Sequence, residues 1–190
     1  EYQAKNINRF FKPTYLSTSE DGEIIKEREL VIIDFNYVNF SNLMNTYKKE
    51  CKKKIKSALI KNKNHEIKIG NKSTDLKKFK KIYEKNLDLI NASKHYYYND
   101  TFYDSLIKNL SDNFLIFSIY IDGKIFTSQL LIHDDENVYC HMYGAINEAR
   151  KKNIIVYSYH ALISWAADNG FKKINLGGGN TSDPNDSLFT

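Results

Sequence analysis

A strand, helix and strand pattern near the end of the sequence constrains this chain more than any other stretch. Residues 138–143 are rich in β-branched and aromatic side chains and end at Gly144, as a strand does. Apolar residues then recur at helical spacing over 154–169, and Gly170 suits the position after the predicted helix. Residues 173–176 predict a second short strand, which runs into three consecutive glycines. Strands joined by one helix are parallel, so we expect these two to run side by side and to diverge near the glycines.

The segment between the first predicted strand and the helix is basic, with Arg150, Lys151 and Lys152 in a row. The N-terminus of a helix carries free N–H groups and the positive end of the helix dipole. This helix start would point into the crevice at the carboxyl ends of the two strands, so we predict a phosphate site there. Three basic residues alone are more often a solvated turn. The glycine run at 177–179 is harder to explain without a ligand, because it adds an entropic cost and no packing.

The rest of the sequence predicts an α/β fold with one mixed sheet. Strands are expected at 10–16, 23–35, 65–69, 114–121 and 124–133, and helices at 41–61, 74–90 and 99–110. The last two of these strands are joined by Asp122-Gly123, a strong hairpin signal. We expect residues 1–64 to form an N-terminal hairpin and a basic helix, packed on a core formed by residues 65–190.

The composition is that of an ordinary globular protein and excludes several classes of site. Hydrophobic residues make up 42% of the 190, and the formal net charge of +5 permits a polyanionic partner without requiring one. Two cysteines make no disulfide framework, which favours a reducing, cytoplasmic location. The longest apolar run, residues 114–121, is too short to span a bilayer, so we expect no stable membrane insertion. No zinc-ligand spacing occurs, and we predict no metal site.

Three stretches carry motifs of one family. They are Ile33-Asp34-Phe35 with the lysine-rich helix that follows, Phe79-x-x-x-Tyr83 with Phe102-Tyr103, and Tyr159 to Trp165 with residues 170, 176–179 and 186–189. With the element order, they resemble the GNAT acyltransferase fold, and within it the Fem-like branch of peptidoglycan-bridge ligases (FemA, FemB and FemX) and related acetyltransferases. The resemblance implies a central, mostly antiparallel sheet with one splayed parallel strand pair, flanked by helices. The loop 144–153 is longer than a usual GNAT phosphate loop, and the chain ends before the final strand pair, so we expect a core truncated at its C-terminus.

The resemblance implies an enzyme that transfers an acyl group, acetyl in the first instance, from acyl-CoA to a primary amine by direct attack. The amine would belong to a small molecule or a peptide, and the setting would be the cytoplasm of a bacterium. The donor would lie between the diverging strands, with its pyrophosphate at the basic loop and its thioester oxygen near the backbone of Tyr143. The implied acyl-CoA contacts are Tyr143, Gly144, Ala145, Arg150, Lys151, Lys152, Asn153, Asn175, Gly177 and Gly178.

Four residues are candidates for moving protons: His141, Tyr98, Tyr143 and Asp186. His141 has the unperturbed pKa nearest to neutral, and we predict it as the base, directly or through a water. Tyr98 or Tyr143 would reprotonate the leaving thiolate, since a phenol suits a general acid better than a base. Asp186 is the second candidate for the base.

Alternation along the strand predicts which of these side chains share a face. It places His141 and Tyr143 on one face and Cys140 and Met142 on the other. His141 serves as a base only if its face is the ligand's face. A half-buried strand histidine with one hydrogen bond is an equally good interpretation of this residue.

Two other functions fit the same pattern. An aminoacyl-tRNA-dependent ligase of the peptidoglycan bridge needs a surface for tRNA, which the lysine-rich residues 48–63 could supply, although such a run is more often a solvated helix face. We expect weak tRNA binding, because the sequence shows no coiled-coil arm of the kind that many such ligases carry. The third candidate is a GNAT-fold binding module without catalysis, which a filled gap beside Tyr143 would favour. The sequence leaves the acceptor and the oligomeric state open.

Overall fold

The computed structural model describes residues 2–3, 10–11, 30–37 and 43–178, and every structural statement below refers to these. The elements are β1 (Tyr2–Gln3), β2 (Phe10–Phe11), β3 (Leu30–Asp34), α1 (Leu43–Thr46), α2 (Lys49–Lys61), β4 (His65–Gly70), α3 (Ser73–Leu89), the 3-10 helix η3 (Lys94–Tyr96), α4 (Asp100–Leu110), the 3-10 helix η4 (Ser111–Asn113), β5 (Phe114–Ile121), β6 (Lys124–His133), β7 (Asn137–Ala145), α5 (Asn147–Lys151), α6 (Ile154–Asp168) and β8 (Lys173–Gly178).

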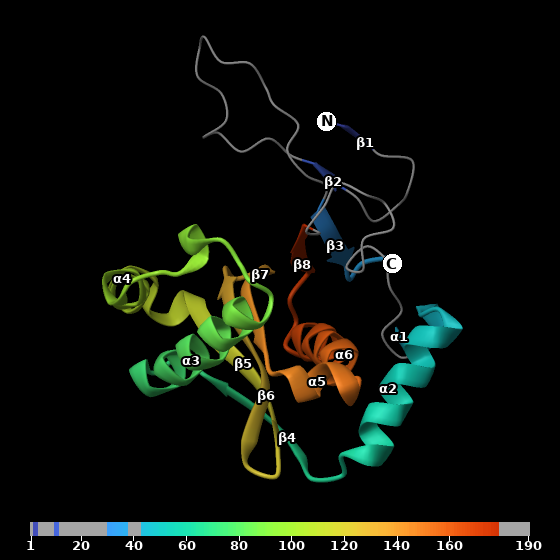
Figure 1. The fold of residues 1–190 in the computed structure, drawn as a ribbon. Coiled ribbons are helices and arrows are strands. Elements are labelled where there is room, and N and C mark those ends of the chain that lie inside the picture. Colours follow the sequence, from blue (N-terminus) through green and yellow to red (C-terminus); the bar gives the residue numbers. More distant parts are fainter. Residues whose placement is uncertain (1, 4–9, 12–29, 38–42, 179–190) are drawn as a thin grey trace.

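One six-stranded sheet organises the molecule, in the order β3-β8-β7-β6-β5-β4. Only β7 and β8 are parallel; the other neighbours in this sheet pair antiparallel. Helices α3 and α4 cover one face, and α6 and α2 lie on the other (Figure 1). This is the α/β fold with a mixed, mostly antiparallel sheet that the sequence predicted. The expected N-terminal hairpin lies largely outside the described residues, and β3 pairs with β8.

Local chemistry explains the long hairpin at the centre of the sheet. Asp122 and Gly123 both adopt positive φ, 49° and 76°, which a two-residue turn of this kind requires and which aspartate and glycine tolerate best. Asn64 Nδ2 donates to Asp122 Oδ1 at 3.1 Å and ties the turn to the start of β4. The hairpin predicted from Asp122-Gly123 is confirmed.

Two apolar cores lie on opposite faces of the sheet. The core under α6 and α2 includes the fully buried Ile55, Phe117, Leu162 and Ile174. The core under α3 and α4 includes Leu76, Phe79, Tyr83, Leu87, Tyr103, Leu106, Phe114, Ile116, Leu130 and Met142. The inward residues of α3 recur every three or four positions, which is the amphipathic pattern that predicted the helix. None of the described helices is long and apolar enough to cross a membrane.

The parallel strands β7 and β8 pair only where they begin. Their aligned residues are Asn137 with Lys173, Val138 with Ile174, and Tyr139 with Asn175. Beyond these pairs, β7 continues against β6 as far as Ala145, and β8 continues against β3 as far as Gly178. The strands are therefore parallel and then separate, as predicted, although the separation begins before the glycines.

A β-bulge in β7 corrects the predicted faces. Leu130 of β6 aligns with Met142 and Leu131 aligns with Cys140, so His141 is an extra residue without a cross-strand partner. The bulge reverses the alternation after it. Cys140 and Tyr143 consequently pack together against the core under α6, while Met142 packs under α3. The predicted pairing of Cys140 with Met142 on one face, and of His141 with Tyr143 on the other, was wrong for this reason.

The segment expected to be a basic loop contains a short helix. Asn147–Lys151 form α5, and Ile146 N donates to Phe126 O at 3.0 Å just before it. Arg150 and Lys151 therefore lie in the last turn of a helix, and Lys152 follows its end. The segment is longer than a glycine turn because it contains this helix.

We predict that Gly144→Ala destabilises the fold by roughly 1–3 kcal/mol, because it overpacks a backbone contact. Gly144 is buried, and a Cβ there would lie 2.8 Å from both Cα and N of Tyr83 in α3. Urea unfolding measures the change. Gly70→Ala is the matched variant: its Cβ would meet Oδ2 of Asp75 at 2.3 Å, a side chain that can move, so the loss should be smaller. An unchanged stability of Gly144→Ala would mean that α3 can shift away from β7.

Candidate functional site

The N-terminus of α6 lacks the groups that would compensate the positive end of its helix dipole. Asn153 precedes the helix with φ 61° and makes no side-chain capping bond, and the first turn contains no acidic residue. The first backbone bond runs from Tyr157 N to Asn153 O at 3.2 Å, so the N–H groups of Ile154, Ile155 and Val156 have no acceptor among the described residues. The start of α4, by contrast, has a side-chain cap at 3.0 Å, and α3 has an aspartate in its first turn. The positive end of the α6 dipole remains available to an anion.

Basic side chains surround this helix start. Arg150, Lys151 and Lys152 are exposed, and neither Arg150 nor Lys151 forms an ion pair with a described carboxylate. Lys152 Nζ lies 5.1 Å from the centre of the Phe126 ring. The neighbouring Lys124 is paired, with its Nζ 3.0 Å from Glu148 Oε1. Three basic residues without a described ion-pair partner and three N–H groups thus follow the carboxyl end of β7.

The C-terminal end of α2 lies at the same end of the sheet. His65, just after α2, packs edge to face on Tyr157 in the first turns of α6, with ring centres 5.1 Å apart. Lys61 and Lys63 are exposed on this part of the chain. Exposed basic residues therefore occur both on α5 and at the end of the lysine-rich helix α2, and Figure 1 shows where these two elements lie.

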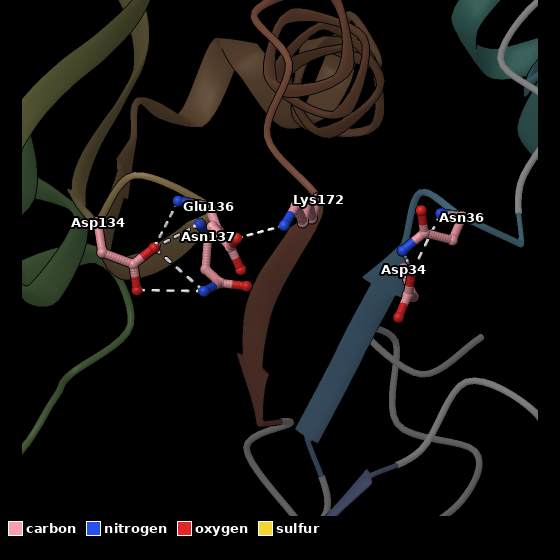
Figure 2. Close-up of polar contacts among 6 residues, drawn as sticks. All are labelled: Asp34, Asn36, Asp134, Glu136, Asn137 and Lys172. Carbon is pink, nitrogen blue, oxygen red and sulfur yellow. Dashed lines mark hydrogen bonds and ion pairs between the residues drawn. The ribbon is translucent and has the colours of Figure 1, made fainter.

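Polar contacts stabilise the end at which β7 and β8 pair with each other. Asp134, in the turn before β7, accepts hydrogen bonds from Glu136 N at 2.8 Å and Asn137 N at 2.6 Å (Figure 2). Burial alone would raise the pKa of Asp134, but these hydrogen bonds outweigh it and lower the pKa. Lys172, just before β8, forms an ion pair with Glu136 and donates its backbone N–H to Glu136 O. These contacts join the starts of both strands, so the strands can separate only further along.

A second set of polar contacts, made by Asp34, joins β3 to β8. Asp34 at the end of β3 accepts from Asn36 N at 3.0 Å and pairs with Lys173 Nζ at 3.1 Å (Figure 2 shows the first contact). Burial alone would raise the pKa of Asp34. The hydrogen bonds from Asn36 and Lys173 outweigh burial, so the pKa is lowered. The carboxylate thus fixes the outer strand at the paired end.

Tyr143 is packed beneath α6. Its ring stacks on that of Tyr159, with centres 5.5 Å apart and planes 14° from parallel. Burial raises the pKa of both phenols well above the usual value and raises the pKa of the Cys140 thiol to about 12. Tyr143 therefore stays protonated at neutral pH and can act as an acid but not as a base. Beside Tyr143, the α6 side of the strand gap is filled by the Tyr159 ring.

Buried polar atoms without partners gather on the same face. Tyr143 Oη, Thr127 Oγ1 and Gln129 Oε1 have no hydrogen-bond partner within 3.5 Å among the described residues, although the Ser158 hydroxyl partly offsets the burial that raises the pKa of Tyr143. Gln129 aligns with Tyr143 across the strands, and its Nε2 lies 3.5 Å from Ser158 Oγ in α6. This cluster was not predicted from the sequence; its signal was the run Thr127-Ser128-Gln129 between the apolar residues of β6.

His141 occupies the bulge and remains exposed. The protein atoms around it nevertheless lower the pKa of its imidazole by partial burial. It is therefore neutral at pH 7, with a ring nitrogen free to accept a proton. The structure keeps His141 in the same strand as Tyr143, one residue from Cys140.

Tyr98 lies on the other face of the sheet from Tyr143. Its ring stacks on Phe102, with centres 4.2 Å apart, and packs against the core under α3. No hydrogen bond or ring contact among the described residues joins it to His141. Asp186 lies outside the described residues. Of the four predicted proton-moving residues, the structure thus brings only His141 and Tyr143 into one strand.

The strand residues that were predicted to contact the acyl donor differ in how deeply they are buried. Gly144 and Ala145 are buried, the first against α3 and the second in the core under α6. Asn175, Gly177 and Gly178 are half-buried and lie at or beyond the last pair with β7. Asn175 Oδ1 accepts from Gly177 N at 2.8 Å, and Gly177 adopts φ 83°, which requires a glycine. The free edge of β8 therefore presents mainly backbone groups. Within the described residues, no group of three potential metal ligands occurs.

The sequence pattern of the acetyltransferase (GNAT) domain matches residues 48–183. No curated protein matches the chain significantly by sequence.

Solved structures share the fold at low sequence identity. FemX superposes with a TM-score of 0.68 at 12% identity, covering 83% of this chain and 55% of that one. The C-terminal domain (DUF2156) of a putative lysylphosphatidylglycerol synthetase from Agrobacterium fabrum gives 0.57 at 11% identity, covering 80% and 47%. L-PGS from Bacillus licheniformis gives 0.54 at 13% identity, covering 86% and 48%. The chain spans about half the length of these structures, whose likeness establishes a Fem-like fold.

We expect Tyr143→Phe to leave the free energy of unfolding unchanged or to raise it by up to about 1 kcal/mol, because it removes a buried hydroxyl that lacks a partner. Urea unfolding measures this. Tyr97→Phe is the control: it removes a hydroxyl that donates to Asp88 Oδ1 at 2.7 Å, and it should cause a small loss. A loss of more than about 1 kcal/mol in Tyr143→Phe would show that its hydroxyl does have a partner.

Proposed function

The chain belongs to the acetyltransferase (GNAT) domain family, and from that premise we propose that it transfers an acyl group, acetyl in the first instance, from acyl-CoA to a primary amine. One observation carries the choice of donor: the uncompensated N-terminus of α6 opens beside unpaired Arg150 and Lys151, at the carboxyl end of a strand that has left its parallel neighbour. Helix N-termini of this kind bind phosphate groups. The family premise and the electrostatics thus favour the same site.

In this proposal the donor spans the open end of the strand pair. Its pyrophosphate binds the N–H groups at the start of α6 together with Arg150, Lys151, Lys152 and Asn153. Its pantetheine arm follows the facing edges of β7 and β8, from Tyr143 to Ala145 on one side and from Asn175 to Gly178 on the other. Those edges are free because the strands share no pairs beyond Tyr139 and Asn175. An extended chain bearing amide groups suits two unpaired strand edges.

The chemistry needs one proton acceptor and one proton donor. A neutral amine attacks the thioester carbonyl, and a backbone N–H near Tyr143 donates to the oxygen as it gains negative charge. His141 takes the proton that the amine loses, which its lowered pKa allows at neutral pH. The C–S bond then breaks, and the CoA thiolate takes a proton from Tyr143; Tyr98, the other predicted acid, lies on the opposite face of the sheet. The acceptor in this proposal is the amine of a small molecule or peptide.

A second candidate donor is an aminoacyl-tRNA, with the peptidoglycan bridge as the product. Lys61 and Lys63 favour it, because they lie at the same end of the sheet as Arg150 and Lys151. That arrangement would let one polyanion contact both surfaces. A donor as large as tRNA would use many of these lysines, whereas CoA needs only the α6 end.

A third candidate is a binding module without catalysis, and the Tyr143–Tyr159 stack favours it. The stack fills the α6 side of the gap where a thioester would approach Tyr143. Under the enzyme proposal, the acyl group must therefore approach along the strand edges or displace Tyr159.

Our first functional prediction is that CoA raises the melting temperature of the wild type and does so much less in Lys151→Glu/Lys152→Glu. The double variant should unfold within about 0.5 kcal/mol of the wild type, since both residues are exposed. Its affinity for CoA should fall at least tenfold, because each lost phosphate contact is a charge-assisted hydrogen bond of about 1.5–3 kcal/mol. Thermal shift and titration calorimetry measure the two quantities.

The matched control is Lys53→Glu/Lys56→Glu on α2, which changes the net charge equally at exposed lysines outside the proposed phosphate site. It should bind CoA as the wild type does. Equal CoA affinity in wild type and Lys151→Glu/Lys152→Glu would place the phosphates elsewhere. Tight tRNA binding that weakens steeply with salt, and that the α2 control loses, would favour the tRNA donor. Absence of binding to either donor would favour the non-catalytic module.

A second prediction concerns the base. Turnover by the wild type should fall as the pH drops through the lowered pKa of His141, because a protonated imidazole cannot accept the proton of the amine. His141→Gln should lose about a hundredfold or more in turnover and also lose this acidic limb. His160→Gln is the control, since burial also lowers its pKa but its ring bonds Tyr47 Oη in the link between α1 and α2. Full activity with an unchanged acidic limb in His141→Gln would make His141 a structural residue.

A further inference from the structure

The outer edge of β4 is open. Among the described residues β4 pairs only with β5, and it is the last strand of the sheet. Its four central residues are exposed, including Ile67 at 42% and Ile69 at 39%. An edge strand with exposed β-branched residues presents unpaired N–H and C=O groups that can bind another strand. Such edges are normally covered or blocked.

The side chains of β4 separate by face into apolar and charged sets. Ile67 and Ile69 align with Ile119 and Phe117, which belong to the core under α6. Glu66 and Lys68 point to the opposite face, where Lys68 Nζ lies 4.7 Å from the centre of the Tyr120 ring and 2.9 Å from Glu66 Oε2. Both charged side chains are more than half exposed.

We propose that a second copy of this chain pairs antiparallel along β4, with the two-fold axis through Ile67. In an isologous pair of this kind, residues whose numbers are equally far from the axis lie opposite each other. Glu66 then faces the partner's Lys68, and Lys68 faces the partner's Glu66. On the other face, Ile67 meets the partner's Ile67, and Ile69 lies opposite the partner's His65. The charged face of the new strand pair is thus complementary, and the other face is apolar at the axis.

Neighbouring registers lack this complementarity. An axis through Glu66 sets the two Glu66 carboxylates against each other, and an axis through Lys68 does the same for the two ammonium groups. An axis that falls between two residues would set side chains of opposite faces against each other, whereas directly opposed residues of an antiparallel pair share a face. A single charged residue on this edge would oppose pairing with a second copy. The order Glu66-Ile67-Lys68 instead permits pairing, but in one register only. The sheet would then continue across the axis as twelve strands, twice the six of one copy.

Sedimentation velocity over a range of concentrations tests this directly. An edge of this size is smaller than a standard interface, so we expect a dissociation constant on the order of 100 µM for the wild type. Glu66→Lys and Lys68→Glu should each weaken dimerisation about tenfold or more, because each places like charges opposite each other twice. An equimolar mixture of the two variants should dimerise again, since every cross-strand pair is then opposite in sign. Glu66→Lys/Lys68→Glu should also recover the wild-type constant to within about threefold.

The control is Glu50→Lys on α2, whose carboxylate lies 3.7 Å from Lys54 Nζ with similar exposure and whose reversal changes the net charge equally. It should leave dimerisation unchanged, and circular dichroism should show every variant folded. A wild type that stays monomeric at about 1 mM would overturn the proposal. So would equal weakening by Glu50→Lys, or a mixture of the two single variants that fails to dimerise. None of these results depends on the catalytic proposal.

Discussion

The structure depends on where the backbone hydrogen bonds of β7 and β8 go. The two strands share three residue pairs, and beyond them each strand pairs only on its far side, β7 with β6 and β8 with β3. Buried backbone groups must find partners, so the facing edges either bind a ligand or reach solvent. The contacts of Asp134, Glu136 and Lys172 hold the strands together at one end. The strands can separate without unfolding the sheet because that end is fixed.

The bulge at His141 connects this opening to chemistry. One extra residue in β7 removes His141 from the ladder and leaves it exposed, while it turns Tyr143 and Cys140 towards α6. The same shift brings Gly144 against the backbone of α3, which only a glycine permits. A single insertion in the register therefore decides which side chains of β7 are exposed and which pack into the cores. It also separates the two tyrosines that the sequence offered as acids, since Tyr98 remains on the α3 face.

Sequence reasoning predicted the features that depend on local patterns. The turn at Asp122-Gly123, the helix that ends before Gly170 and the parallel strands around it all follow from residues close together in the chain. The bulge at His141 could not be predicted, because it depends on how β7 aligns with β6. The stacking of Tyr159 on Tyr143 likewise depends on how α6 packs on the sheet. Helical periodicity could predict only that Tyr159 faces inward. Local patterns therefore predicted where the strands separate but not which faces the side chains of β7 take, and the ligand site at the strand ends stays a prediction.

Charge distinguishes the two ends of the strand pair. At the paired end, Lys172 and Lys173 are neutralised by Glu136 and Asp34. At the open end, Arg150 and Lys151 lack such partners, and α6 adds the positive end of its dipole. An anion approaching β7 and β8 is therefore attracted to the end where the backbone edges are free, and not to the end where they are paired. Both proposed donors, acyl-CoA and aminoacyl-tRNA, are polyanions, so under either proposal this field favours binding at the open end. The choice between the two donors must then come from how far the contacts extend along α2, which is a matter of ligand size more than of charge.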